Sequence, residues 1–375
     1  MSAFDPKADI GCSRFLQCKL IVRPISLVAN PCCNRVLIGV VPALVKAMRR
    51  REFITGIAGA AAACQFMAGA QQSAMPVVGV VSGQSSDADA RNATAFHKGL
   101  KEAGLVEDQN VTVEYHWLAG QYGPLATLMA DLVNRQVAVI ATTASAPAAL
   151  AAKAATSTIP IVFSVGQDPI ELGLVTSLAR PSGNVTGINL FTMEVTAKQL
   201  RLLHDLVPKA GRIAVLVNPA NAPTAESTTR GVQEAAPAIG LQIQIFNAAT
   251  PEEIDSTFAT FANQHPDALL VAPDAFFTSR RVQFATLTAR DRIPAIYANR
   301  DLITAGGLMS YGTDLADGAR QVGIYTGRIL KGARPADLPV LQSTKFDFAI
   351  NVQAARALGI KVPPDLLSIA DEVIE

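Results

Sequence analysis

Side chains that could hold a small charged molecule follow several short apolar runs of the sequence. Thr143 and Ser145 come at the end of the run VAVIATT and just before an alanine-rich stretch. Hydroxyl groups and the free N–H groups at a helix start could bind a carboxylate there. Asp168 and Asp274 follow two other apolar runs, and each carboxylate could accept an ammonium group. Together these residues predict a site for a small zwitterion.

Aromatic side chains near the same positions could form apolar or stacking walls for that molecule. The candidate ligand-binding residues are Ser82, Ser85, Thr143, Ser145, Asp168, Phe191, Asn218, Asp274, Phe276, Tyr297, Ser310 and Tyr311. A second interpretation stays open for each of them. Ser, Thr and Asp at a helix start are often plain N-caps, and an aromatic residue near a strand end is often part of the core.

The elements that must position these residues follow a regular order of short apolar runs and longer helical patterns. We expect strands at 76–83, 110–117, 137–143, 160–166, 185–190, 212–219, 241–247, 268–273, 294–298, 308–311 and 346–351. We expect helices at 87–104, 122–135, 147–156, 169–179, 193–207, 222–239, 252–264, 279–290 and 315–330, and another near Ala354.

This order predicts an α/β protein made of two doubly wound parallel-sheet lobes, joined by crossing hinge strands. We expect the first lobe at 71–188 with part of 306–340 crossing back, and the second at 189–305 with part of 341–375. Ligands of such sheets gather beyond the carboxyl ends of the strands. The positions that should face the interlobe cleft are 82–85, 142–145, 165–168, 189–191, Asn218, 274–277, 297–300 and 310–312.

Motifs for catalysis are missing from residues 71–375. This part contains no cysteine, and its four histidines (His97, His116, His204 and His265) have no metal-ligand spacing. It has no G-x-S-x-G elbow, Walker loop or dinucleotide fingerprint after a strand. Within residues 71–375, acidic side chains outnumber basic ones, which does not suggest a nucleic-acid surface. We therefore expect no enzyme, no metal and no cofactor.

The stretch MRRREFITGIAGAAAACQFMAGAQQ, residues 48–72, has the layout of an export signal. A basic head precedes an uncharged apolar run and a small-x-small site before Gln71. We expect a signal peptide at 48–70 and a non-native extension at 1–47. Arg50-Arg51 leaves a twin-arginine route open, and Cys64 leaves lipid anchoring open as a minor alternative. All five cysteines lie at or before this signal, which fits a periplasmic protein without thiols.

From Pro76 to the end, the chain resembles the tryptophan/tyrosine-type substrate-binding proteins of ABC transporters. The resemblance is carried by NVTVEYHWLAGQYGPLATLMADLV, IPIVFSVGQDPIELGLVTSLARPSGNVTG, LVNPAN, YANRDLITAGGLMSYGTD, GRILKGARPADLPV, KFDFAIN and PPDLLSIADEVIE. It implies a type I periplasmic binding protein fold, with a ligand site between two lobes. It also implies that Thr143, Ser145, Asp168, Asp274, Ser310 and Tyr311 line that site.

The resemblance further implies a monomer that delivers a small organic solute to an ABC permease and its ATPase. For some members of the family the solute is an aromatic amino acid. Two other functions stay open from the residues alone, an exported ligand-sensing protein and a secreted enzyme on the same fold. Neither a nucleic-acid partner nor membrane contact apart from the permease is expected.

Overall fold

The computed structural model describes residues 75–375, with only the backbone at 192 and 193. The predicted extension at 1–47 and the predicted signal peptide at 48–70 lie outside the described residues. The strands of the described part form two sheets, one of six strands and one of seven. No helix among residues 75–375 has the length and apolar character needed to cross a membrane.

The first sheet has the strand order β11-β5-β4-β3-β1-β2, and all of its pairs are parallel. Its strands are β1 (Val77–Ser82), β2 (Thr112–Trp117), β3 (Val139–Thr143), β4 (Ile161–Val165), β5 (Val185–Asn189) and β11 (Leu341–Gln342). Its helices are α3 (Ser86–Glu102), α4 (Leu125–Asn134), α5 (Ala146–Ala155) and α12 (Leu315–Leu330), with the 3-10 turn η3 (Pro335–Asp337).

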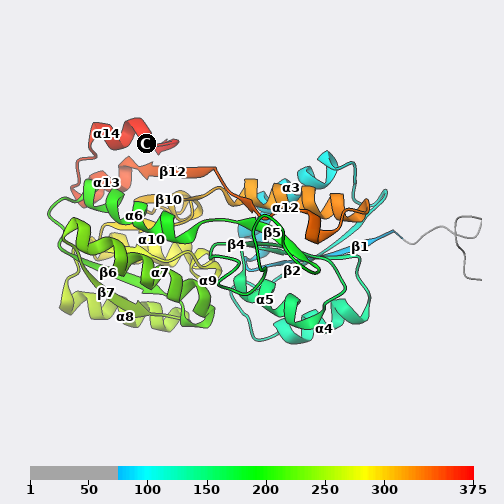
Figure 1. The fold of residues 1–375 in the computed structure, drawn as a ribbon. Coiled ribbons are helices and arrows are strands. Elements are labelled where there is room, and N and C mark those ends of the chain that lie inside the picture. Colours follow the sequence, from blue (N-terminus) through cyan, green and yellow to red (C-terminus); the bar gives the residue numbers. More distant parts are fainter. Residues whose placement is uncertain (1–74) are drawn as a thin grey trace, which may run out of the picture. The chain divides into compact units, whose positions relative to one another are not determined.

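Alternate residues of these strands bury their side chains on opposite faces of the sheet, as the period of a β-strand requires. Val81 and Ile140 pack with the apolar residues of α4 and α5. Val80 and Ala141 pack on the other face with α3 and α12. Figure 1 shows α3 and α12 side by side on one face, with α4 and α5 on the other. The strands are covered on both faces, which explains their near-continuous apolar sequences.

The second sheet has the strand order β13-β12-β10-β9-β8-β6-β7. Its strands are β6 (Arg212–Val217), β7 (Gln242–Asn247), β8 (Ala268–Val271), β9 (Ala295–Tyr297), β10 (Met309–Thr313), β12 (Phe346–Asn351) and β13 (Glu372–Ile374). Its helices are α6 (Thr192–Leu206), α7 (Ala222–Ala235), α8 (Pro251–Gln264), α9 (Ala275–Ser279), α10 (Arg281–Arg290), α11 (Asp301–Thr304), α13 (Val352–Leu358) and α14 (Pro364–Ile369), with the 3-10 turns η1 (Pro219–Asn221) and η2 (Ala236–Ile239). Its two faces are also both covered, by separate apolar clusters. The predicted α/β fold with two doubly wound lobes is therefore confirmed.

Three segments of the chain pass between the two sheets and lie together as a hinge. They follow β5, β10 and β11. The N–H of Asp314 donates to the carbonyl oxygen of Lys345 at 3.0 Å, and the N–H of Ser343 donates to that of Asn189 at 2.9 Å. The hydroxyl of Thr313 donates to the carbonyl oxygen of Leu190. These bonds tie each crossing segment to another.

Three details of the predicted fold are wrong. The helix expected at 169–179 does not form: after one turn, in which Leu172 N–H donates to Asp168 O, Gly173 adopts a φ of +68°. A left-handed residue of this kind ends a helix. The second sheet is not fully parallel, because β12 runs antiparallel to β10 after the last crossing. The helix expected from 279 begins at Arg281 and is preceded by a separate short helix, α9.

Candidate ligand-binding cleft

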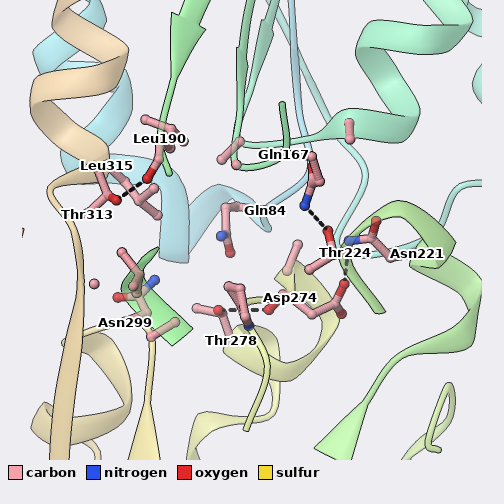
Figure 2. Close-up of a pocket in the computed structure, with 18 residues that line it drawn as sticks. Gln84, Gln167, Leu190, Asn221, Thr224, Asp274, Thr278, Asn299, Thr313 and Leu315 are labelled. Carbon is pink, nitrogen blue, oxygen red and sulfur yellow. Dashed lines mark hydrogen bonds between the residues drawn. The ribbon is translucent and has the colours of Figure 1, made fainter. Parts of the chain in front are cut away.

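A cleft lies between the two lobes, where the carboxyl ends of both sets of strands meet the hinge. Polar side chains from both lobes line it: Gln84, Gln167, Asn221, Thr224, Asp274 and Thr278. Leu190 and Leu315 contribute apolar surface from the hinge side (Figure 2). The space in which the centre of a water-sized sphere fits has a volume of about 90 Å³. The cleft is therefore small, and its lining is mostly polar, with aliphatic side chains at the hinge.

Asp274 is the one ionisable side chain among the residues that line this cleft. It follows β8 and caps α9, accepting from the N–H of Phe276 at 2.9 Å. The side-chain amides of Asn218 and Asn221 donate to its two carboxylate oxygens at 2.9 and 2.8 Å. The residue is only 7% exposed, and no side chain of the described residues forms an ion pair with it. Its negative charge is hydrogen-bonded but not compensated.

The environment of Asp274 acts on its pKa in two directions. Burial away from water disfavours the charged carboxylate and raises the pKa of Asp274. The hydrogen bonds from Asn218, Asn221 and the N–H of Phe276 oppose that rise, because they stabilise the charged form. The net direction is upward, so a cation that entered the cleft would relieve the cost of burying this charge.

Two buried amides that line the cleft have unused hydrogen-bonding capacity. Asn221 uses its Nδ2 on the Asp274 carboxylate, which orients its Oδ1 as an acceptor, and this buried oxygen has no partner among the described residues. Gln84 is 5% exposed, and its Oε1 likewise has no partner there. Figure 2 shows the Gln84 amide extending into the cleft, toward the side that holds Thr278 and Asp274. Buried polar groups normally have partners, and these two oxygens belong to residues that line the cleft, so they are candidate contacts for a bound molecule.

The lobes touch across the cleft in several places, so the structure has a closed form. Gln167 of the first lobe donates from Nε2 to the hydroxyl of Thr224 in the second, at 3.1 Å. Two ion pairs also bridge the lobes. Arg281 lies 2.8 Å from Asp87, and Arg230 lies 2.7 Å from Glu171. These contacts leave only a narrow space around Asp274 and Gln84.

A smaller hollow adjoins the cleft and shares with it Asn299, Thr313 and three other lining residues. Its charged side chains are Arg91, Arg300, Asp301 and Asp347. Arg91 lies 3.5 Å from Asp314 and 3.8 Å from Asp347, and Arg300 forms an ion pair with Glu372. This outer hollow therefore has charges of both signs, whereas the inner cleft has one negative charge.

The structure brings part of the predicted set to the cleft. Asp274 lines it, and Asn218 is held directly behind by its hydrogen bond to Asp274. Thr143 and Ser145 flank the lining residue Ala144, but both are buried, and the hydroxyl of Ser145 accepts from the N–H of Ala148 as the cap of α5. The alternative of a plain cap describes what Ser145 does in this structure.

Other members of the set lie near the cleft without lining it. Ser82 is buried and accepts from the N–H of Gln84, and the hydroxyl of Ser85 donates to Asp87. Phe191 lies in the hinge with a φ of +56°. Phe276 gives its N–H to Asp274, while its ring packs beside Phe277 in the second lobe.

The remaining four residues do not line the cleft. Tyr297 is fully buried against Phe284 in the second core, and Ser310 is buried in β10. Tyr311 stacks on Phe346, with 5.9 Å between the ring centres. Asp168 is exposed and accepts from the N–H of Ile170 at 2.7 Å.

Several lining residues were missed by the sequence-based selection. Gln84, Gln167 and Asn299 lie within the strand-end stretches expected to face the cleft, so the position in the fold could have indicated them. Asn221, Thr224 and Thr278 lie just beyond such stretches, in the first turns that follow β6 and β8. The only signal for these was their distance along the chain from a strand end.

The described chain is similar to substrate-binding proteins over nearly its whole length. Residues 74–374 match the family described as ABC transporter substrate binding protein. A tyrosine-binding protein of Clostridioides difficile is 24% identical over 266 residues, which cover 71% of this chain and 76% of that protein. Its name states what that relative binds.

Two solved structures are similar in fold as well as sequence. The ABC domain of Streptococcus pneumonia in complex with L-Trp is 27% identical, with a TM-score of 0.73, and covers 80% of this chain and 100% of its own. A conserved domain protein from Vibrio cholerae is 26% identical, with a TM-score of 0.74 and the same coverage. The resemblance inferred from the sequence motifs is therefore confirmed. The chain belongs to the ABC transporter substrate-binding proteins, a family of binding proteins rather than enzymes.

Proposed function

We propose that this protein is the solute-binding component of an ABC importer and that it captures a small organic solute, such as an amino acid, in the interlobe cleft. The observation that carries the proposal is the uncompensated Asp274 carboxylate, held by Asn218 and Asn221 in a cleft between two hinged lobes. A solute that contacts both lobes favours the closed form over the open one, by as much as its affinity differs between them.

Capture and release need no covalent chemistry from the protein. An amine could enter the open cleft, place its positive charge beside Asp274 and hydrogen-bond to Gln84 of the other lobe. Closure would then form the bridges Arg281–Asp87 and Arg230–Glu171. The partner that recognises the closed form would be a membrane permease with its cytoplasmic ATPase. One similar structure is a complex with L-Trp, and one relative is named a tyrosine-binding protein. Both support an amino acid as the class of solute.

A thermal-shift screen of the purified protein tests the binding role. A solute present at 100 times its dissociation constant stabilises the folded state by about 2.7 kcal/mol, which raises the melting temperature by several degrees. The screen should contain amino acids of all classes, benzoates and other small carboxylates. The proposal predicts that at least one solute shifts the melting curve and is recovered chemically unchanged. A screen in which no solute shifts the curve contradicts a solute-binding role.

The importer role needs its own test. Members of this family typically work outside the cytoplasm, and residues 48–72 have the layout of an export signal. We propose that the mature protein begins at Gln71 and works in the periplasm. N-terminal sequencing of protein recovered from the periplasm should give Gln71 first. Retention of the upstream residues, or recovery only from the cytoplasm, would contradict this.

A further inference from the structure

We infer that the cleft selects a compact aliphatic amine, of about the size of alanine or threonine, and not an aromatic amino acid. The inference rests on the proposed function and narrows its solute class. It is carried by three features of the cleft: a single uncompensated negative charge, unpartnered amides from opposite lobes, and a small closed volume with no aromatic side chain in its lining.

The charge selects a cation. Asp274 is the only ionisable group that lines the inner cleft, and no arginine, lysine or histidine of the described residues pairs with it. Cationic side chains begin only in the outer hollow, where Arg91 and Arg300 already pair with carboxylates. A purely anionic solute would add a second buried negative charge beside Asp274 without a counter-ion, which is strongly unfavourable.

The hydrogen-bonding groups select a donor. The Oδ1 of Asn221 is fixed as an acceptor because the Nδ2 of the same amide donates to Asp274. The Gln84 amide makes no side-chain hydrogen bond within the described residues and is 5% exposed. An ammonium group has three N–H donors and no acceptor, so it suits a site that offers a carboxylate and amide oxygens. Gln84 then becomes the contact from the first lobe, and Asp274 that from the second.

The size and lining of the closed cleft favour a small aliphatic solute over a ring. An enclosed apolar cavity of about 150 Å³ accommodates benzene, whereas the space inside this closed cleft measures about 90 Å³ and adjoins the outer hollow. None of the lining side chains is aromatic. Of the rings next to lining residues in the sequence, those of Phe276 and Tyr297 pack into the second core, and that of Tyr311 stacks on Phe346. The body of the solute would contact Leu190, Val195 and Leu315, which are aliphatic.

Isothermal titration of the full-length protein with matched solutes tests this inference. We expect glycine, L-alanine, L-serine or L-threonine to bind at least tenfold more tightly than L-tryptophan and L-tyrosine. L-Lactate has a hydroxyl in place of the ammonium group of L-alanine and should bind at least tenfold more weakly than L-alanine. Equal binding of L-lactate and L-alanine would overturn the role of the charge. Tighter binding of L-tryptophan or L-tyrosine would overturn the size limit while leaving the proposed function intact. If none of the amino acids, benzoates and small carboxylates binds, the proposed function fails as well.

Two variants test the residues. Charge-assisted hydrogen bonds of this kind change affinity by roughly 10- to 100-fold, so Asp274→Asn should weaken L-alanine binding by that factor. Gln84→Ala removes the amide from the other lobe without altering the Asp274 network, and it should weaken binding by roughly tenfold. Asp168→Asn is the matched control, because Asp168 is exposed and does not line the cleft. Unchanged L-alanine affinity in Gln84→Ala, with a folded protein by circular dichroism, would remove Gln84 from the site.

Discussion

Gly120 of the first lobe lies directly against the backbone of Phe276 in the second lobe. A Cβ atom on Gly120 would lie only 2.5 Å from the Cβ of Phe276 and 2.7 Å from its Cα and N atoms. Contacts below 3.0 Å do not occur at real Cβ atoms. The same Phe276 N–H donates to Asp274, so the point where the lobes touch is joined to the candidate site by one hydrogen bond.

Gly120→Ala should therefore hold the lobes apart. The new methyl group cannot move aside, because backbone atoms face it, and the closed form becomes less populated. Small-angle X-ray scattering should show a larger radius of gyration than for the unmodified protein. Fluorescence of Trp117, the only tryptophan of the chain, should report a changed environment, since the loop after Trp117 makes this contact.

Two controls separate the collision from other effects of the alanine. Gly120 has a φ of +77°, which disfavours alanine by about 1 kcal/mol even without a collision. Gly173→Ala carries a similar strain, with a φ of +68° and no atom within 4 Å, and it should leave the scattering unchanged. Gly123→Ala lies in the same loop as Gly120 and meets nothing. If Gly120→Ala scatters like both controls, closure does not depend on this contact.

The ion pair between Arg281 and Asp87 should contribute only modestly to closure. Asp87 is 61% exposed and Arg281 is 30% exposed, and pairs in such positions are worth about 0.2–1 kcal/mol. Arg281→Gln should therefore weaken solute affinity by about fivefold at most, and 0.5 M NaCl should remove the difference from the unmodified protein. Arg334→Gln breaks a pair with Asp337 within one lobe and should not change affinity. An effect of Arg281→Gln that high salt does not reduce would indicate another role for Arg281.

Closure by this pair should not depend on pH near neutrality. The hydrogen bond from Ser85, followed by that from Arg281, lowers the pKa of Asp87 to about 2. A carboxyl group whose pKa is lowered on folding stabilises the folded state above its ordinary value of 3.8. That contribution is lost as the pH falls through about 2. Solute affinity should therefore have the same pH dependence between pH 5 and 8 in the unmodified protein and in Asp87→Asn.

The buried carboxyl of Asp274 should give the opposite pH dependence of stability. Burial raises its pKa above 3.8, so its protonated form favours folding. The stabilisation is complete below pH 3.8 and is lost as the pH rises through the raised pKa. The free energy of unfolding of the unliganded protein should therefore fall, relative to Asp274→Asn, as the pH rises from 4 to 8. Urea denaturation of both proteins measures this difference.

The comparison with Asp274→Asn also isolates the group that titrates. Asp89, Asp301 and Asp347 have pKa values raised by burial too, but they are present in both proteins. Their contributions cancel in the difference between the two curves. Parallel curves for the two proteins would show that the hydrogen bonds from Asn218 and Asn221 offset the effect of burial completely.

The sequence predicted the fold better than the site for a physical reason. Residues 315–330 and 346–351 were predicted as a helix and a strand with the bounds that the structure has. Apolar periodicity determines both, because each element must turn its apolar side to a core. The strand-end rule likewise identified the stretches that contain Gln84 and Gln167. It did not identify which residue in each stretch faces the cleft.

That choice depends on the turn after each strand. Successive residues point in opposite directions until the chain bends, and the bend depends on tertiary contacts. Ser82 and Gln84 would point to the same face if the strand continued. After the bend, Gln84 lines the cleft, whereas the hydroxyl of Ser82 accepts the N–H of Gln84 and does not line it. The hydrogen bonds around Asp274 could not be predicted from the sequence pattern either. Asn218 and Asn221 both donate to its carboxylate, and each lies more than 50 residues from Asp274 in the sequence.

The last prediction concerns α3 and α12, two helices of the first lobe that are far apart in the sequence. Helices α3 and α12 cross at glycines, so that their backbones come close. A Cβ on Gly323 would lie 2.2 Å from the carbonyl oxygen of Phe96. Glycine inside a helix normally costs about 1 kcal/mol relative to alanine, which favours replacement. The collision with backbone outweighs that gain, because overpacking in a core costs about 1–3 kcal/mol.

Gly323→Ala should therefore lower the melting temperature, whereas Gly318→Ala in the same helix should not. At Gly318 the only close atom is the Cδ2 of Leu190 at 3.0 Å, the end of a flexible side chain that can move aside. Both variants have the same gain in helix propensity, so their difference measures the cost of separating α3 from α12. Equal melting temperatures for the two variants would show that the helices can move apart without loss. The structure does not favour that outcome, because the carbonyl oxygen of Arg320 lies equally close to Gly99, 2.0 Å from a Cβ there.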